Sequence, residues 1–126
     1  MQGGWECGVD LMKLPVSPTA IFSHNYEMTL GLMRALAEVG ALCPRRVSVL
    51  GFDDFVVGMN GFSWATMFST KPTCVSQPSY EMGRKAVELL LKKIQRTAGS
   101  DKPEEGIVRL RAELRIREST APPQVP

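Results

Sequence analysis

Apolar residues fall into short runs typical of strands and longer stretches with helical spacing. The runs at 19–23 and 47–52, TAIFS and VSVLGF, are rich in the β-branched and aromatic residues that favour strands. Between them, Asn25 is a suitable N-cap and Gly40 a suitable end for a helix of about four turns. A strand, a helix and a second buried strand form a βαβ unit. We therefore expect a parallel sheet with a right-handed crossover.

The first predicted helix has apolar residues on two nearly opposite faces. One stripe consists of Met28, Leu32, Ala35, Leu36 and Val39. The other consists of Tyr26, Leu30, Met33 and Ala37. A helix on the surface of a protein needs only one apolar stripe. Two stripes predict burial on both sides, either inside the monomer or against a partner.

The second half of the chain predicts three further elements. Residues 73–76 are typical of a short strand, and Ser79 is a suitable cap for a helix over 80–96. One face of that helix is apolar, with Gly83, Ala86, Val87, Leu90 and Ile94. Residues 107–118 alternate between apolar and charged side chains, which predicts a half-buried strand with its arginines on a solvated face. The proline-rich end, 119–126, is expected to be a flexible tail.

Composition and charge narrow the classes of function. A formal net charge of +2 is too small to indicate a nucleic-acid-binding surface. The scattered Cys7, Cys43 and Cys74 and the single His24 form neither a disulfide framework nor a metal site, so we expect no metal and no cofactor. The chain shows no signal peptide and no apolar run of membrane-spanning length. These absences predict a soluble protein of the cytoplasm.

Short polar side chains follow both strands of the predicted βαβ unit. Asn25 comes after the first strand and Asp53 after the second. Parallel α/β sheets bind ligands at the carboxyl ends of their strands, where such side chains hydrogen-bond sugar hydroxyls or amides. The alternative, which spacing alone favours, is that Asn25 only caps its helix and that Asp53 or Asp54 only makes a turn. Trp5 lies among glycines and is able either to stack on a ligand ring or to fill the edge of a core.

Two catalytic interpretations have little support in the sequence. His24 follows Ser23, but the residues around this serine do not form the nucleophile elbow of a hydrolase. The adjacent carboxylates of Asp53 and Asp54 suit magnesium in a phosphatase-like site, but the lysine and the further acid that such a site needs are not apparent. We therefore expect that the chain is not an enzyme.

Four segments of the chain resemble, in order, the C-terminal part of LacI/GalR-family transcriptional regulators: PTAIFSHNYEMTLGLMRALAEVG, VSVLGFDDF, TCVSQPSYEMGRKAVELLLKKI and LRAELRIREST. The resemblance implies an α/β fold of the type 1 periplasmic-binding-protein-like class, a three-layer sandwich around a parallel sheet. In that fold two subdomains close on a small effector. Residues 1–126 would be a partial effector-binding and dimerisation domain, mainly the C-terminal subdomain. DNA binding would require an N-terminal helix-turn-helix that is absent here.

The resemblance also assigns roles to individual residues. It implies that Asp53 points into the effector cleft, while Asp54 supports the turn. It implies that Asn25 is the cleft asparagine and that Trp5 stacks on the ligand. Gln77 lies near a crossover between the subdomains and is a further candidate for effector binding. Residues 55–63 resemble an insertion relative to the family.

The two opposed apolar stripes predict a homodimer or higher oligomer, and the resemblance suggests where the contacts lie. In the family, the helix matching residues 25–39 and the stretch after GFDD lie at the dimer interface. This suggests as contacts Leu30, Met33, Phe62, Trp64 and Met67. The helix over 80–96 would pack on the N-terminal subdomain that the chain lacks.

The expected function is the sensing of a small sugar or nucleoside-like effector by a transcriptional repressor. A solute-binding component of a sugar transporter shares the fold and is the alternative among binding proteins. A small α/β hydrolase or phosphatase is the alternative from another class, and it needs a nucleophile and a base that the sequence does not supply.

Overall fold

The computed structural model describes residues 1–54, 56–57, 62–95 and 107–122. Its helices are α1 (Gln2–Lys13), α2 (Tyr26–Glu38), the 3₁₀ helix η1 (Trp64–Met67) and α3 (Ser79–Gln95). Its strands are β1 (Ala20–Phe22), β2 (Ser48–Phe52), β3 (Val56–Val57), β4 (Phe62–Ser63), β5 (Thr73–Ser76) and β6 (Glu113–Arg115). Part of the predicted insertion over 55–63 lies outside the described residues.

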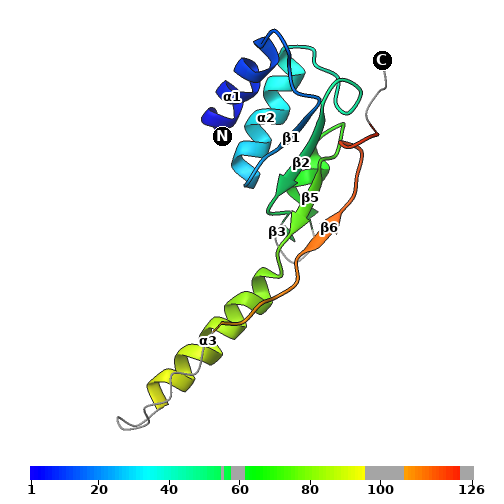
Figure 1. Ribbon diagram of the computed structural model, residues 1–126. Helices are drawn as coiled ribbons and strands as arrows, with labels where there is room; N and C mark the ends of the chain where they lie inside the picture. The colour runs from blue at the N-terminus through cyan, green and yellow to red at the C-terminus, as the bar shows by residue number, and fades with distance from the viewer. Residues whose placement is uncertain (55, 58–61, 96–106, 123–126) are drawn as a thin grey trace.

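One four-stranded sheet carries the fold, in the strand order β1-β2-β5-β6. β1, β2 and β5 run parallel, and β6 pairs with β5 in the antiparallel direction (Figure 1). β3 and β4 form a separate two-stranded antiparallel pair. The predicted βαβ unit is confirmed, with α2 between β1 and β2. Because the first three strands are parallel, their carboxyl ends meet at one edge of the sheet.

Helix α1 was not predicted from the sequence, because its segment contains three glycines, which are poor helix formers. α1 lies beside α2 (Figure 1), and the two backbones approach closely. A Cβ atom on Gly4 would lie 2.3 Å from the carbonyl oxygen of Met28, and one on Gly31 would lie 2.1 Å from that of Met1. The glycines therefore serve the contact between the two helices rather than a turn.

Most of both apolar stripes of α2 is covered by this chain itself, whereas Ala37 and Val39 near the end of the helix stay exposed. The first packs against β2, in a core that contains Leu32, Leu36, Val47 and Val49. The second packs against η1 and β5, where Tyr26 and Leu30 contact the cluster of Trp64, Ala65 and Cys74. Of the two explanations left open for a double stripe, the structure has burial inside the monomer.

This packing leaves little surface on two of the predicted dimer contacts. Met33 is only 7% exposed and Trp64 only 5%, so the packing does not favour their role at an interface, which stays a prediction. Leu30 is partly buried against the Trp64 cluster. Phe62 and Met67 remain largely exposed, and a role for them at an interface stays a prediction.

The other face of the sheet is open in the described part of the chain. By the register of the strands it carries Phe22, Leu50, Phe52, Val75 and Leu114. Phe22 is 59% exposed, although its ring packs edge-to-face on Phe52 at 6.4 Å between centroids. In the described ranges, helices such as α2 cover only one face of the sheet. The sheet and these helices form two layers of the predicted three-layer sandwich.

Helix α3 projects away from the sheet, accompanied by the segment 107–112 (Figure 1). Their contact is lined by Met82, Lys85, Ala86, Leu89, Val108 and Leu110. No described residue of α3 is buried, and Val87, Leu90 and Ile94 in its apolar stripe are more than half exposed. Of the helices in the described ranges, none combines the length and the hydrophobicity that a bilayer span requires.

Two predictions for the C-terminal region are corrected. The predicted strand over 107–118 is limited to the three residues of β6, because β5 pairs only from Cys74 to Ser76. The expected flexible tail does not begin at residue 119. Ser119 is fully buried, and its hydroxyl donates to the carbonyl oxygen of Val49 at 2.5 Å and accepts from the amide of Thr73 at 2.7 Å.

Candidate functional site

Three of the predicted site residues share the carboxyl edge of the sheet. Asn25 and Asp53 each lie three residues beyond a paired position, since Phe22 pairs with Leu50. Gln77 follows the last residue of β5. The parallel register therefore brings all three to one edge. The positions of the strands predicted this for Asn25 and Asp53, whereas Gln77 is a candidate only through the family resemblance.

Asp53 is held in an unusual backbone conformation. Its φ is 70°, in the left-handed region that asparagine and aspartate tolerate better than most residues. Its amide donates to the carbonyl oxygen of Val75 at 3.0 Å, and its own carbonyl oxygen accepts from the indole of Trp64 at 2.9 Å. The turn that the sequence suggested for the two acids exists, and Asp53 occupies its strained position.

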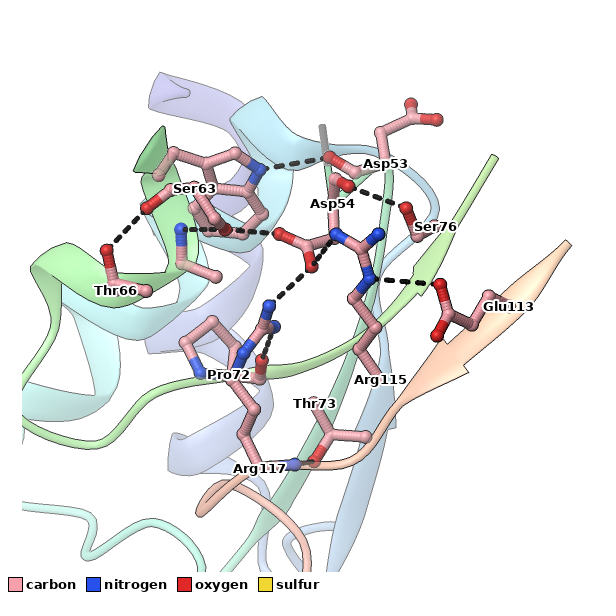
Figure 2. Close-up of polar contacts among 12 residues, drawn as sticks. Asp53, Asp54, Ser63, Thr66, Pro72, Thr73, Ser76, Glu113, Arg115 and Arg117 are labelled. Carbon is pink, nitrogen blue, oxygen red and sulfur yellow. Dashed lines mark hydrogen bonds and ion pairs between the residues drawn. The ribbon is translucent and has the colours of Figure 1, made fainter. Parts of the chain in front are cut away.

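The carboxylate of Asp53 is oriented by Gln77. The side-chain amide of Gln77 donates to Oδ1 of Asp53 at 2.5 Å. Figure 2 shows the carboxylate of Asp53 pointing away from the cluster of side chains below it. In the described part of the chain, no side chain bonds to Oδ2 of Asp53. The edge thus presents an oriented carboxylate oxygen, which is a strong acceptor for a hydroxyl group.

Asn25 caps α2, which is the structural one of the two interpretations given for this residue. Its Oδ1 accepts from the amide of Met28 at 2.8 Å. Its Nδ2 lies 3.4 Å from Nε2 of the exposed His24. The cap uses the oxygen and leaves the amino group at the edge, so a role of Asn25 in ligand binding stays a prediction.

Trp5 lies elsewhere, on α1. Its indole donates to Oε2 of Glu38 at 2.6 Å, and the guanidinium of Arg34 lies 5.9 Å from the centre of its ring. Hydrogen bonds from Arg34 and from Trp5 lower the pKa of Glu38. Glu38 ends α2, whereas Asn25 precedes its first residue. The structure therefore does not bring Trp5 to the edge with Asp53, because the helical backbone of α1 directs the side chain along α2.

The carboxylate of Asp54 is fully buried, whereas that of Asp53 is only partly buried. Figure 2 shows the polar contacts of Asp54. Oδ1 accepts a short hydrogen bond from the hydroxyl of Ser63. Oδ2 accepts from Arg117 at 2.5 Å and from Arg115 at 3.3 Å. Its carbonyl oxygen accepts from the hydroxyl of Ser76 at 2.8 Å. We call Asp54, Ser63, Arg115 and Arg117 the Asp54 cluster.

The charges of the Asp54 cluster compensate one another. Burial opposes the ionised form of Asp54, but the hydroxyl of Ser63 and the guanidinium groups of Arg117 and Arg115 outweigh it and lower the pKa of the carboxyl group. The prediction of a solvated arginine face is therefore wrong for Arg115 and Arg117. Sequence analysis missed this cluster because its members lie up to 63 positions apart. The only local signal was the second acid of the GFDD motif.

The catalytic interpretations gain nothing from the geometry. The hydroxyl of Ser23 is directed to the carbonyl oxygen of Asn25, at 3.5 Å. Burial raises the pKa of Cys74 to about 11, which keeps this thiol protonated. Among the residues that the structure describes, no group of three or more histidine, cysteine and acidic side chains is arranged to hold a metal ion.

Comparison with known proteins matches almost the whole chain to one family. The periplasmic binding protein-like domain matches residues 3–120. The transcriptional repressor PurR of Vibrio atlanticus is 34% identical over 101 residues, which are 75% of this chain and 28% of that protein. The repressor CytR of Escherichia coli is 35% identical over 95 residues, 75% of this chain and 26% of that protein. The chain thus spans little more than a quarter of the length of these relatives.

Solved structures give the same result for the fold. A LacI-family regulator from Enterococcus faecium with bound ribose superposes with a TM-score of 0.74 and 31% identity, over 98% of this chain and 41% of that one. A LacI-family regulator from Lactobacillus casei with bound sucrose superposes with a TM-score of 0.72 and 27% identity, over 94% of this chain and 40% of that one. The predicted fold class, periplasmic-binding-protein-like with a mainly parallel sheet, is confirmed.

Proposed function

Since the chain belongs to the LacI/GalR family of transcriptional regulators, in the C-terminal part of the effector-binding domain, we propose that its carboxyl edge forms one wall of an effector site. The effector is a small molecule rich in hydroxyl groups, a sugar or a nucleoside. The observation that carries the proposal is the carboxylate of Asp53, which Gln77 orients and which points away from the Asp54 cluster in Figure 2.

The chemistry of the edge suits hydroxyl groups. An ionised carboxylate oxygen accepts hydroxyl hydrogens in charge-assisted bonds, which are stronger than neutral ones. Oδ2 of Asp53 supplies the acceptor, and the carbonyl of Gln77 and the amino group of Asn25 add an acceptor and a donor nearby. Neighbouring hydroxyls of a sugar ring present donors and acceptors in this way. Ribose, sucrose and glucose are bound in LacI-family regulators that this chain resembles.

Assembly and location follow the same proposal. A second copy of the chain would meet it through Phe62 and Met67, the predicted contacts that remain well exposed, with Leu30 at the margin. Binding to DNA belongs to a helix-turn-helix domain outside this chain. A cytoplasmic location stays the expectation for such a regulator.

The alternatives rank lower. A solute-binding component of a sugar transporter would use the same edge, but the named relatives over three quarters of the chain are repressors. A hydrolase or phosphatase would need a nucleophile, and Ser23 is 5% exposed and bonded to the backbone. We propose that the chain binds its effector without converting it.

Saturation-transfer NMR tests the proposal, because it detects the weak binding that is expected when only one wall of the site is present. Ribose, glucose and adenosine are each mixed with the 126-residue chain, and the transfer of magnetisation to ligand protons is measured. We expect transfer for at least one of them, with affinity in about the millimolar range, and its loss in Asp53→Asn.

Asp10→Asn is the matched control, because it makes the same change at an exposed aspartate on α1 that pairs only with Lys13. Equal transfer in wild type and Asp53→Asn, or none with any of the three ligands, would contradict the proposal.

A further inference from the structure

The two adjacent acids of the GFDD motif are coupled through their backbone. The amides of Asp53 and Asp54 both donate to the carbonyl oxygen of Val75, at 3.0 and 3.2 Å. The carbonyl oxygen of Asp53 is held by Trp64, and that of Asp54 is held by Ser76. The peptide unit that joins the two acids is therefore held at the carbonyl oxygen of Asp53 by Trp64 and at the amide of Asp54 by Val75, and a displacement of Asp54 would act through this unit on the backbone conformation of Asp53.

We propose that Asp54 is a positioning residue. The ion pairs of its buried carboxylate with Arg115 and Arg117 hold Asp53 in the left-handed conformation that directs the Asp53 carboxylate to the effector. The C-terminal segment of the chain thereby sets the geometry of the effector edge. The ligand part of this inference rests on the proposed function, whereas the geometry of Asp53 is tested without a ligand.

The conformation of Asp53 needs such support. A non-glycine residue at φ 70° is strained, and it stays there only when its surroundings over-determine the backbone. Three separate parts of the chain converge on its neighbour: β4 through Ser63, β5 through Ser76 and the end of the chain through Arg117. The lowered pKa of Asp54 agrees with a cluster that stays charged and intact at neutral pH.

A purely structural role is the competing explanation. Under it, the Asp54 cluster only joins β6 to the rest of the sheet, and weakening it lowers stability without altering the folded state. The positioning role predicts in addition that the folded state changes around Asp53. The two explanations therefore differ in what the folded molecules show and not in the stability of the protein.

The two tryptophans of the chain allow NMR to distinguish the two explanations. The indole of Trp64 donates to Asp53, and that of Trp5 donates to Glu38 on the far end of α2. In an amide-correlation NMR spectrum the two indole resonances report separately on the Asp53 turn and on an unrelated contact. The side-chain amide of Gln77 is a second reporter, since it donates to the carboxylate of Asp53.

The experiment compares Arg117→Gln, Arg115→Gln and Ser63→Ala with the wild-type chain. Arg115 is 35% exposed in its side chain and Ser63 is a small residue, so these two variants keep the test available if Arg117→Gln does not fold. Lys71→Gln is the matched control, because it removes a positive charge that pairs with Glu118 in the same C-terminal segment but not with Asp54.

We expect the resonances of the Trp64 indole and the Gln77 amide to shift in the cluster variants. The Trp5 indole should stay in place, and Lys71→Gln should leave all three resonances unchanged. Arg115→Lys, which retains the charge, should return the resonances toward wild type. Wild-type positions of both reporters in folded Arg115→Gln and Ser63→Ala, whatever their stability, would overturn the inference.

Measuring ligand binding to a cluster variant distinguishes a failure of this inference from a failure of the proposed function. The ligand that gives saturation transfer with wild type should bind Arg115→Gln about tenfold more weakly, the loss of one hydrogen bond to a charged group. Unchanged affinity would contradict positioning. The Trp64 and Gln77 resonances could shift in the cluster variants although no ligand gives saturation transfer with the wild-type chain. That result would support the positioning of Asp53 by Asp54 and would reject the effector site.

Discussion

The two faces of the sheet differ in how completely this chain covers them. On one face, α2 closes a core around Leu36, Val47 and Val49, and α1 packs on α2 through glycine contacts. On the other face, Phe22 and Leu114 stay more than half exposed in the described part of the chain, and α3 carries its apolar stripe in solvent. Large apolar side chains exposed in this way make the open face and α3 candidates for contacts with a partner. The covered face gives the chain its stability, and the open face is available for contacts.

The largest expected effect comes from the covered face. Leu36→Ala leaves a cavity in the core and should lower the free energy of unfolding by about 2–5 kcal/mol. Leu90→Ala on α3 removes the same atoms from a half-exposed position and should change it by less than about 0.5 kcal/mol. Urea unfolding followed by circular dichroism measures both. Similar losses in the two variants would show that α3 is buried in solution.

The Asp54 cluster should give the next largest effect, because its buried carboxylate joins the turn after β2 to the C-terminal segment through two ion pairs. Asp54→Asn leaves two guanidinium groups without their carboxylate and should cost about 1–3 kcal/mol at neutral pH. The folded-state pKa of Asp54 is lowered below the unfolded value of about 3.9. The wild type therefore keeps this contribution above that value and loses it as the pH falls through the folded-state pKa.

Unfolding measured across acidic pH checks this sign. The difference between wild type and Asp54→Asn should shrink on acidification, since protonation removes the charge that the substitution removes. A difference that is constant from neutral to acidic pH would contradict the role of the ion pairs.

Charges placed on the exposed apolar stripe of α3 should weaken self-association of the chain and change its stability little. Leu90→Glu together with Ile94→Glu places charges in the exposed stripe of α3. We expect weaker self-association in light scattering and an unfolding free energy within about 0.5 kcal/mol of wild type for each substitution. Ala37→Glu, on an exposed position of α2, is the control for added charge. An unchanged, monomeric wild type at high concentration would show that the open surface has no partner in a second copy.

The smallest effect is expected with DNA. The formal net charge of +2 predicts only weak, salt-sensitive binding to duplex DNA without sequence preference. A gel-shift comparison of unrelated duplexes at physiological salt checks this. Preference for one sequence would place a DNA-reading surface inside these 126 residues.

The sequence predicted the part of the fold that local patterns encode. The apolar runs and the Asn25 cap are local signals, and they predict the βαβ unit and the shared edge of Asn25 and Asp53, whereas Gln77 is suggested only by the family resemblance. Helix α1 could not be predicted, because glycine lowers helix propensity locally while the benefit of Gly4 and Gly31 arises only when α2 is in place.

The remaining differences have the same long-range origin. Alternation over 107–118 indicates which side chains share a face, but the length of β6 depends on the short partner strand β5. The pairing of Arg115 and Arg117 with a buried carboxylate depends on Asp54, far away in the sequence. The second stripe of α2 is covered by Trp64 and its neighbours, which no pattern within the helix reveals.

An effector wall at Asp53 is best tested by mapping where a ligand binds on the chain. The backbone, side-chain amide and indole resonances of the wild-type chain are followed while the ligand selected by saturation transfer, or ribose, is added. We predict that the resonances that move belong to Asn25, Asp53, Gln77 and the Trp64 indole. The Trp5 indole, held by Glu38, should remain fixed. Shifts centred on Trp5 or on the open face of the sheet, with Asp53 and Gln77 unmoved, would contradict the account.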